Sequence, residues 1–114
     1  MINEKILYKK KSNSYGTTII FSNGFKICKM SYPVSVEVKT AFGNLYRSGS
    51  IALPDFPIAF SDVPTVNYTI NGNGYLYARG SNGASKTNSG SIFAVRTTST
   101  NTLNIIVDII AIGF

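Results

Sequence analysis

LNIIVDIIAIGF, residues 103–114, is the stretch that decides the fold of this chain. Successive side chains of a β-strand point to opposite faces. One face therefore carries Leu103, Ile105, Val107, Ile109 and Ala111, and the other carries Asn104, Ile106, Asp108, Ile110, Ile112 and Phe114. Both faces are largely apolar, whereas a strand in a small antiparallel sheet usually has one polar face. A domain of this size has one core, so we expect the second face to pack against another subunit through Ile106, Asp108, Ile110, Ile112 and Phe114.

The composition of the 114-residue chain favours β-structure. Hydrophobic residues make up 44% and charged residues only 14%, below the roughly 25% that is typical of soluble domains. Ser, Thr and Asn fill many polar positions, and these residues suit strands and turns better than helices. The single cysteine, Cys28, excludes a disulfide within the chain and is expected to be a small buried side chain on a strand.

Half of the net charge of +6 lies within the first eleven residues, where Glu4 is outnumbered by four lysines: Lys5, Lys9, Lys10 and Lys11. No basic helix or RNA-binding motif accompanies them, so we do not expect nucleic-acid binding. No apolar run approaches the ~18 residues of a membrane span, so no membrane insertion is expected. The N-terminus also lacks the apolar core of a secretory signal peptide.

The strand pattern predicts one all-β domain. Strands are expected at residues 17–21, 25–30, 34–38, 65–70, 75–79, 91–97 and 103–113, with loops and short strands between 41 and 56. Asn23-Gly24 predicts a tight hairpin, and Asn71 to Gly74 predicts a second turn. We therefore expect an antiparallel β-sandwich of about six to eight strands over residues 15–114, preceded by a basic arm at residues 1–14.

Residues for catalysis are scarce. The chain has no histidine, which excludes Ser-His-Asp and Cys-His catalysis and the common zinc sites. Of its five carboxylates, Asp55 and Asp62 flank one apolar segment, but both also fit turns. The sequence therefore predicts a protein that is not an enzyme and that needs no metal or cofactor.

A patch of aromatic and polar residues is the candidate ligand site. Tyr75, Tyr77 and Arg79 share one face of their expected strand. Tyrosine rings can pack against the apolar face of a sugar, and Arg and Asn can hydrogen-bond its hydroxyls. The polar loop that follows adds Asn82 and Asn88. The same patch also fits a subunit interface, where Tyr and Arg are enriched.

Asp108 is the one charge within the apolar terminal strand. A buried charge needs a partner. We expect a structural role for it, with Arg79, Arg96 or a neighbouring subunit as the partner.

Several short motifs, taken in order, resemble the C-terminal domains of phage tail-fibre and baseplate proteins. They are Gly16-Thr-Thr-Ile-Ile-Phe-Ser-Asn-Gly24, Ala41-Phe-Gly-Asn-Leu-Tyr46, Phe56-Pro-Ile-Ala-Phe60, Ser61-Asp-Val-Pro-Thr-Val66 and Ile109-Ile-Ala-Ile-Gly113. The second half is also similar to H-type lectin domains, which are six-stranded sandwiches that form trimers and bind sugars. The chain departs from both patterns in having no Trp and no His, and Phe114 stands where many tail relatives have Arg-Trp.

The resemblance implies a homotrimer at the tip of a phage tail, or in an extracellular tail-like particle, that attaches to a host cell-surface saccharide alongside other tail proteins. Because the sugar-contacting His and Trp of the lectins are absent, the resemblance transfers no binding residue to this chain. Two alternatives stay open at this point: a purely structural tail or baseplate component, and a cellular lectin of the H type.

Overall fold

The computed structural model of the chain describes residues 8–71, 76–79 and 82–114. These residues form nine strands in antiparallel pairings and no helix. The strands are β1 (Tyr8–Ser12), β2 (Gly16–Phe21), β3 (Lys26–Phe42), β4 (Leu45–Ser48), β5 (Ile51–Ala52), β6 (Thr65–Asn71), β7 (Leu76–Arg79), β8 (Ser91–Arg96) and β9 (Thr100–Gly113). The predicted all-β antiparallel fold is confirmed. Within the described ranges there is no helix that could cross a membrane.

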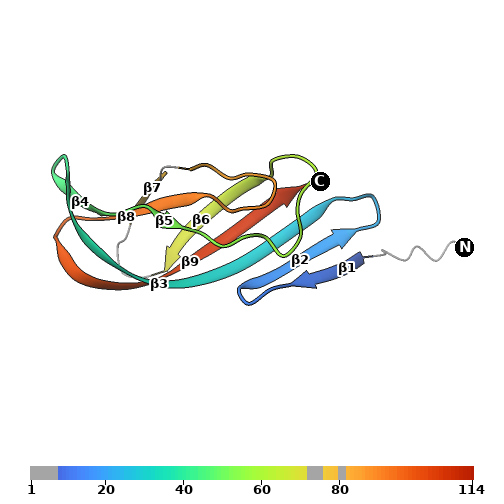
Figure 1. Ribbon diagram of the computed structural model, residues 1–114, viewed down its shortest axis with the longest axis horizontal. Coiled ribbons are helices and arrows are strands. Elements are labelled where there is room, and N and C mark those ends of the chain that lie inside the picture. Colours follow the sequence, from blue (N-terminus) through green and yellow to red (C-terminus); the bar gives the residue numbers. More distant parts are fainter. Residues whose placement is uncertain (1–7, 72–75, 80–81) are drawn as a thin grey trace, which may run out of the picture.

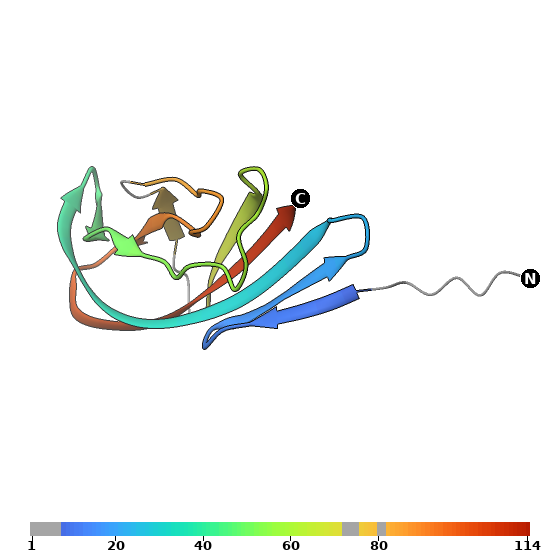
Figure 2. The same ribbon diagram turned by 45° about the vertical axis from the view of Figure 1, so that its right-hand side comes forward.

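The strands form one hydrogen-bonded sheet that folds over into two layers (Figure 1). The first layer has the order β1-β2-β3-β9-β6, and in the second layer β8 pairs with β4, β5 and β7. The layers are joined where β3 curves up and pairs with β4, which is clearest in Figure 2. Residues 8–12, expected within a basic arm, form the exposed edge strand β1.

Strand β3 runs through Pro33 without a break, although the sequence predicted two separate segments. Pro33 has no N–H to donate, so proline is tolerated only where a strand edge lacks a partner. The N–H of Ser31 donates to the carbonyl of Tyr15 (3.0 Å), and the pairing of β2 with β3 ends at Met30. In an antiparallel ladder the peptide groups of every second residue face the same neighbouring strand. After Ser31 the next residue whose backbone faces β2 is Pro33, which lies beyond the start of β2. The missing N–H of Pro33 therefore costs no ladder hydrogen bond.

The predicted hairpin between β2 and β3 is confirmed. Gly24 has a φ of 92°, a left-handed conformation that glycine adopts without a steric penalty. Its N–H donates to the carbonyl of Phe21 (2.9 Å), and the N–H of Phe21 donates to the carbonyl of Phe25 (2.8 Å). The Asn23 side chain accepts from the N–H of Phe25 (3.0 Å) and completes the turn.

The core lies between the two layers and is organised by β9. All five side chains on the predicted inner face of β9 are buried: Leu103, Ile105, Val107, Ile109 and Ala111. They belong to the same cluster as Ile92 and Ala94 of β8 and as Phe56 and Phe60 of the segment before β6. Cys28 of β3 is also fully buried, as the sequence predicted.

Strands β6 and β7 lie in different layers of the sandwich. β6 pairs with β9 in the first layer, and β7 pairs with β8 in the second. The predicted turn around residues 72–74 lies outside the described residues. Tyr68 of β6 and Tyr77 of β7 nevertheless lie at the same side of the sandwich, where their rings meet.

Candidate binding surfaces

The structure describes part of the predicted ligand patch. Tyr75 lies outside the described residues, and Arg79 is described only as the last residue of β7. Tyr77 lies on β7 opposite Ala94 of β8 and is 44% exposed. Its exposed ring is available to a ligand at the surface.

Tyr77 packs edge-to-face against Tyr68, with ring centroids 5.8 Å apart and an interplanar angle of 74°. The two rings line a surface pocket of about 400 Å³ together with Val63, Val66, Asn82, Gly83, Ala84 and Ser91. The structure therefore brings together two residues of the predicted patch, Tyr77 and Asn82. Tyr68 was not predicted as part of this site, because it lies on β6 in the other layer and meets Tyr77 only in the folded chain.

Backbone hydrogen bonds fix the loop that forms one wall of this pocket. The N–H of Asn82 donates to Oγ of Ser91 (2.9 Å), and the N–H of Ser91 donates to the carbonyl of Asn82 (2.8 Å). The Tyr68 hydroxyl donates to the carbonyl of Ser89 and so anchors the same loop to β6. The backbone of Asn82 is held in place while its exposed side chain stands at the pocket.

Asn88 lies apart from this pocket and uses its side chain within the fold. Its amide nitrogen donates to the carbonyl of Leu53 (3.0 Å) and to Oδ1 of Asp55 (2.7 Å), and its Oδ1 accepts from the N–H of Gly90 (2.7 Å). Asn88 also forms a β-bridge with Asp55. The structure therefore gives Asn88 the task of fastening the loop of residues 82–90 to the segment after β5.

The outer face of the first layer carries an exposed apolar surface. Four apolar residues predicted to form a subunit interface are between 39% and 51% exposed on this face: Ile106, Ile110, Ile112 and Phe114. Ile27 of β3 lies opposite Ile112, and Ile19 of β2 lies opposite Ile27, so the apolar surface continues across three strands. The ring of Phe25 extends it by packing against Phe114 at 5.4 Å.

Asp108 interrupts this apolar face with a small polar cluster. Its carboxylate accepts from the Ser31 hydroxyl (2.6 Å) and from the Asn71 side-chain amide. Both partners lie on the strands that flank β9: Ser31 of β3 is directly opposite Asp108, and Asn71 of β6 lies two pairs along, opposite Ile106. Within one subunit its described partners are thus two neutral donors. Of the expected partners, Arg96 lies in the other layer, on β8, and the side chain of Arg79 lies outside the described residues.

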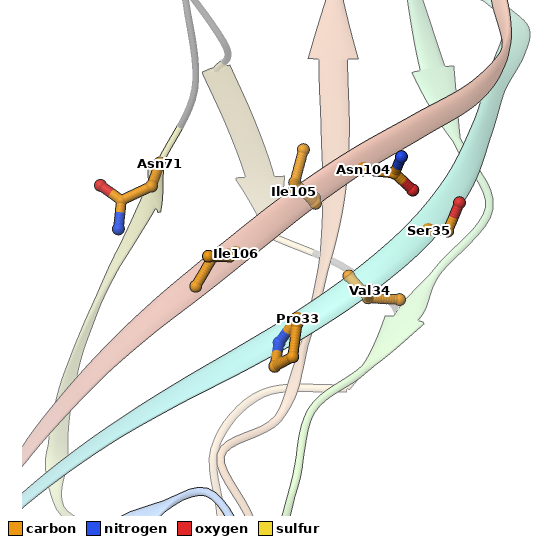
Figure 3. A pocket seen from close by; sticks show the side chains of 7 residues that line it. All are labelled: Pro33, Val34, Ser35, Asn71, Asn104, Ile105 and Ile106. Atoms are coloured by element: carbon orange, nitrogen blue, oxygen red, sulfur yellow. The ribbon is translucent and has the colours of Figure 1, made fainter.

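A hollow of about 540 Å³ lies next to this cluster, at the end of β6 (Figure 3). It is lined by Pro33, Val34 and Ser35 of β3, by Asn104, Ile105 and Ile106 of β9, and by Asn71 of β6. Pro33 pairs with Ile106 and Ser35 with Asn104, so the hollow combines an apolar centre with polar edges. It belongs to the same outer face as Ile110 and Ile112.

The described residues contain no group of three or more His, Cys, Asp or Glu side chains that could hold a metal ion. Burial raises the pKa of the Cys28 thiol, and the side chain of Thr18, opposite it on β2, lowers the pKa by a smaller amount. The thiol is therefore less available as a thiolate than an exposed cysteine.

The fold that these elements define is a two-layered antiparallel β-sandwich with one long strand shared between the layers. A solved structure with this fold is the N-truncated R1-type pyocin tail fiber, to which the chain is similar with a TM-score of 0.62 and 18% sequence identity. The similarity covers 96% of this chain and 87% of the tail fiber chain. No protein-family model and no curated protein matches the sequence.

Proposed function

We propose that this chain is a receptor-binding domain of a phage tail or tail-like particle, which attaches to a saccharide of the host cell surface and catalyses no reaction. The observation that carries the proposal is the pocket between Tyr68 and Tyr77, on a fold shared with a tail fiber. In this proposal the domain lies at the tip of the tail and works beside other tail proteins.

The chemistry of the pocket favours a neutral saccharide. The rings of Tyr68 and Tyr77 and the side chains of Val63 and Val66 offer apolar contact to the C–H face of a sugar ring. The Asn82 side chain can donate to and accept from hydroxyl groups. Among the described side chains no charged one lines the pocket, so these side chains offer no ionic partner to an acidic or amino sugar.

We propose that the outer face of β9 forms the subunit interface of a homotrimer. Ile106, Ile110, Ile112 and Phe114 expose apolar surface on one face, and larger exposed patches of this kind mark interaction sites. Three weak sugar sites on one particle would bind a cell surface with an avidity well above that of a single site. The polar cluster of Asp108 would then specify the alignment of the subunits, as single polar groups do in other apolar interfaces.

The proposal is tested by binding the labelled protein to whole bacterial cells and to a glycan panel, with Tyr77→Ala and Tyr77→Phe variants. Tyr77→Ala is expected to weaken binding about tenfold or more, since stacking on an aromatic ring contributes on the order of 1 kcal/mol per contact and avidity multiplies the loss. Tyr77→Phe retains the ring and should bind nearly as the parent does. Tyr8→Ala is the matched control, because Tyr8 is also exposed but lies on edge strand β1.

A second candidate function is a purely structural tail or baseplate component. The extent of the apolar outer face favours it, since that surface needs only protein partners. A folded trimer that binds no cell and no glycan would support this structural role and contradict receptor binding.

A further inference from the structure

A second groove lies on the open side of the sandwich, between β3 and the segment that leads into β5. Two adjoining hollows share Tyr32 and Ala52 and together form this groove. One hollow extends to Tyr15 and Asp55, and the other extends to Glu37. The groove is separate from the Tyr68–Tyr77 pocket, with which it shares no lining residue.

Strand edges form both sides of the groove. β2 pairs with β3 only as far as Met30, and β4 begins to pair at Val38. Residues 31–37 of β3 therefore pair with no strand on this side within the described chain, over a length of about 23 Å at roughly 3.3 Å per residue. On the opposite side of the groove, the N–H of Leu53 donates to the carbonyl of Gly90 (3.0 Å). Because the peptide groups of successive strand residues point in opposite directions, those of Ala52 point away from β8, toward the groove.

Two tyrosines form an aromatic surface at one end of the groove. The rings of Tyr15 and Tyr32 pack edge-to-face with centroids 5.2 Å apart, and Tyr15 is 41% exposed. Asn13 holds this end in place. Its Oδ1 accepts from the N–H groups of Tyr15 (2.8 Å) and Gly16 (3.0 Å), and its amide donates to the carbonyl of Asp55 (3.0 Å).

The charge of the groove is opposite to that of the chain. The chain has 11 Lys and Arg residues against five Asp and Glu, yet within the part of the chain that the structure describes only Asp55 and Glu37 bring charge to the lining of the groove. Both are exposed. Oδ1 of Asp55 accepts from Asn88 (2.7 Å), and its other oxygen has no hydrogen-bond partner among the described residues.

We propose that this groove binds an oligosaccharide that carries free amino groups. The sugar rings would pack on Tyr15 and Tyr32, and an ammonium group would pair with the free oxygen of Asp55. Glu37, at the far end, would contact a later unit of the same chain. Between Asp55 and Glu37, the unpaired peptide groups of β3 would hydrogen-bond the hydroxyl groups of the sugar.

The test is calorimetric titration of the full chain with a glucosamine oligomer and with its N-acetylated counterpart of the same length. We expect the free-amine oligomer to bind and the N-acetylated one to bind about tenfold more weakly or not at all, because a hydrogen bond to a charged group contributes about 1.5–3 kcal/mol. Raising the ionic strength from about 0.1 M to about 1 M should weaken binding, since the Debye length falls from about 10 Å to about 3 Å.

Three variants make the test specific. Asp55→Asn removes the charge and keeps an oxygen for Asn88, so it should fold normally and bind about tenfold more weakly. Asp62→Asn, at an exposed aspartate outside the groove, is the matched control and should bind as the parent does. Tyr77→Ala should also leave this binding unchanged, which separates the groove from the pocket of the proposed function.

Equal binding of both oligomers, or full binding by Asp55→Asn, would overturn the proposal. It would also be overturned if the groove served a second copy of the chain. In that case the parent protein would self-associate with rising concentration, Asp55→Asn would abolish the association, and neither oligomer would bind.

Discussion

Tyr68 and Tyr77 meet edge-to-face at 5.8 Å although they lie on β6 and β7, which belong to different layers of the sandwich. Their contact joins the two layers at this side of the molecule. Such aromatic pairs contribute about 0.5–1.5 kcal/mol beyond the burial of their surface. The same two rings therefore stabilise the fold and shape the candidate sugar pocket.

Replacing Tyr68 with Phe should lower the free energy of unfolding by about 1 kcal/mol, because the carbonyl of Ser89 loses the donated hydroxyl. The ring contact with Tyr77 remains. Urea denaturation of the parent and the variant measures the difference. An unchanged unfolding midpoint would show that water replaces the hydroxyl at no cost.

Replacing Ile109 with Ala should destabilise the domain by about 2–5 kcal/mol, because this side chain is fully buried in the core. Val63→Ala is the control, since Val63 is 59% exposed and surface changes usually stay within about 0.5 kcal/mol. Thermal or urea unfolding distinguishes the two variants. Equal effects would contradict the assignment of Ile109 to the core.

Replacing Ile110 with Lys should dissociate the proposed trimer and leave the fold of each subunit intact, because Ile110 is 45% exposed on the outer face. Sedimentation gives the mass, and circular dichroism reports the fold. Asn101→Lys adds the same charge at an exposed position at the start of β9 and should leave the mass unchanged. A parent protein that sediments as a monomer at micromolar concentration would refute the interface.

Replacing Gly16 with Ala should destabilise the β2–β3 pairing by about 1–3 kcal/mol, as overpacking does. A Cβ at this position would lie 2.0 Å from the Lys29 carbonyl oxygen and 2.7 Å from the Met30 Cα. Gly49→Ala is the control, because a Cβ there meets nothing within 4 Å. Gly16→Ala should lower the denaturation midpoint. Gly49→Ala should leave it unchanged or raise it slightly, since alanine at an open site reduces the conformational entropy of the unfolded chain.

Burial raises the pKa of the Cys28 thiol, so the free energy of unfolding should fall as the pH rises above the ordinary cysteine pKa. Below the ordinary cysteine pKa of about 8.5 the thiol is protonated in both states, and its contribution is fully present. As the pH rises toward the raised pKa, the unfolded chain ionises first and stability falls. Cys28→Ala should remove this part of the pH dependence of unfolding, and alkylation of the native parent should be much slower than that of the unfolded chain.

The two faces of β9 were predictable from the sequence because alternation is a local property. Ile109 is buried and Ile110 is exposed, as strand parity requires. The Asn23-Gly24 hairpin was equally local, since the turn depends on the conformation of Gly24 alone.

The sites depend on contacts between distant segments, and these the sequence did not reveal. Tyr68 and Tyr77 become neighbours although their strands lie in different layers, and Asn88 hydrogen-bonds Asp55 instead of lying beside the tyrosines. Strand β3 continues through Pro33 because of where its neighbour β2 stops, which no local pattern encodes. Proline alone would have predicted a break.

The position of β9 also determines when the domain can fold during synthesis. β9 lies between β3 and β6 and pairs with both, yet it is made after the other eight strands. More than half of the chain separates β3 from its partner residues in β9, and pairing over such a separation is slow. During synthesis on the ribosome the first layer therefore cannot form until residues 100–113 have been made. A chain truncated before residue 100 would leave the edges of β3 and β6 that face β9 without a strand to pair with.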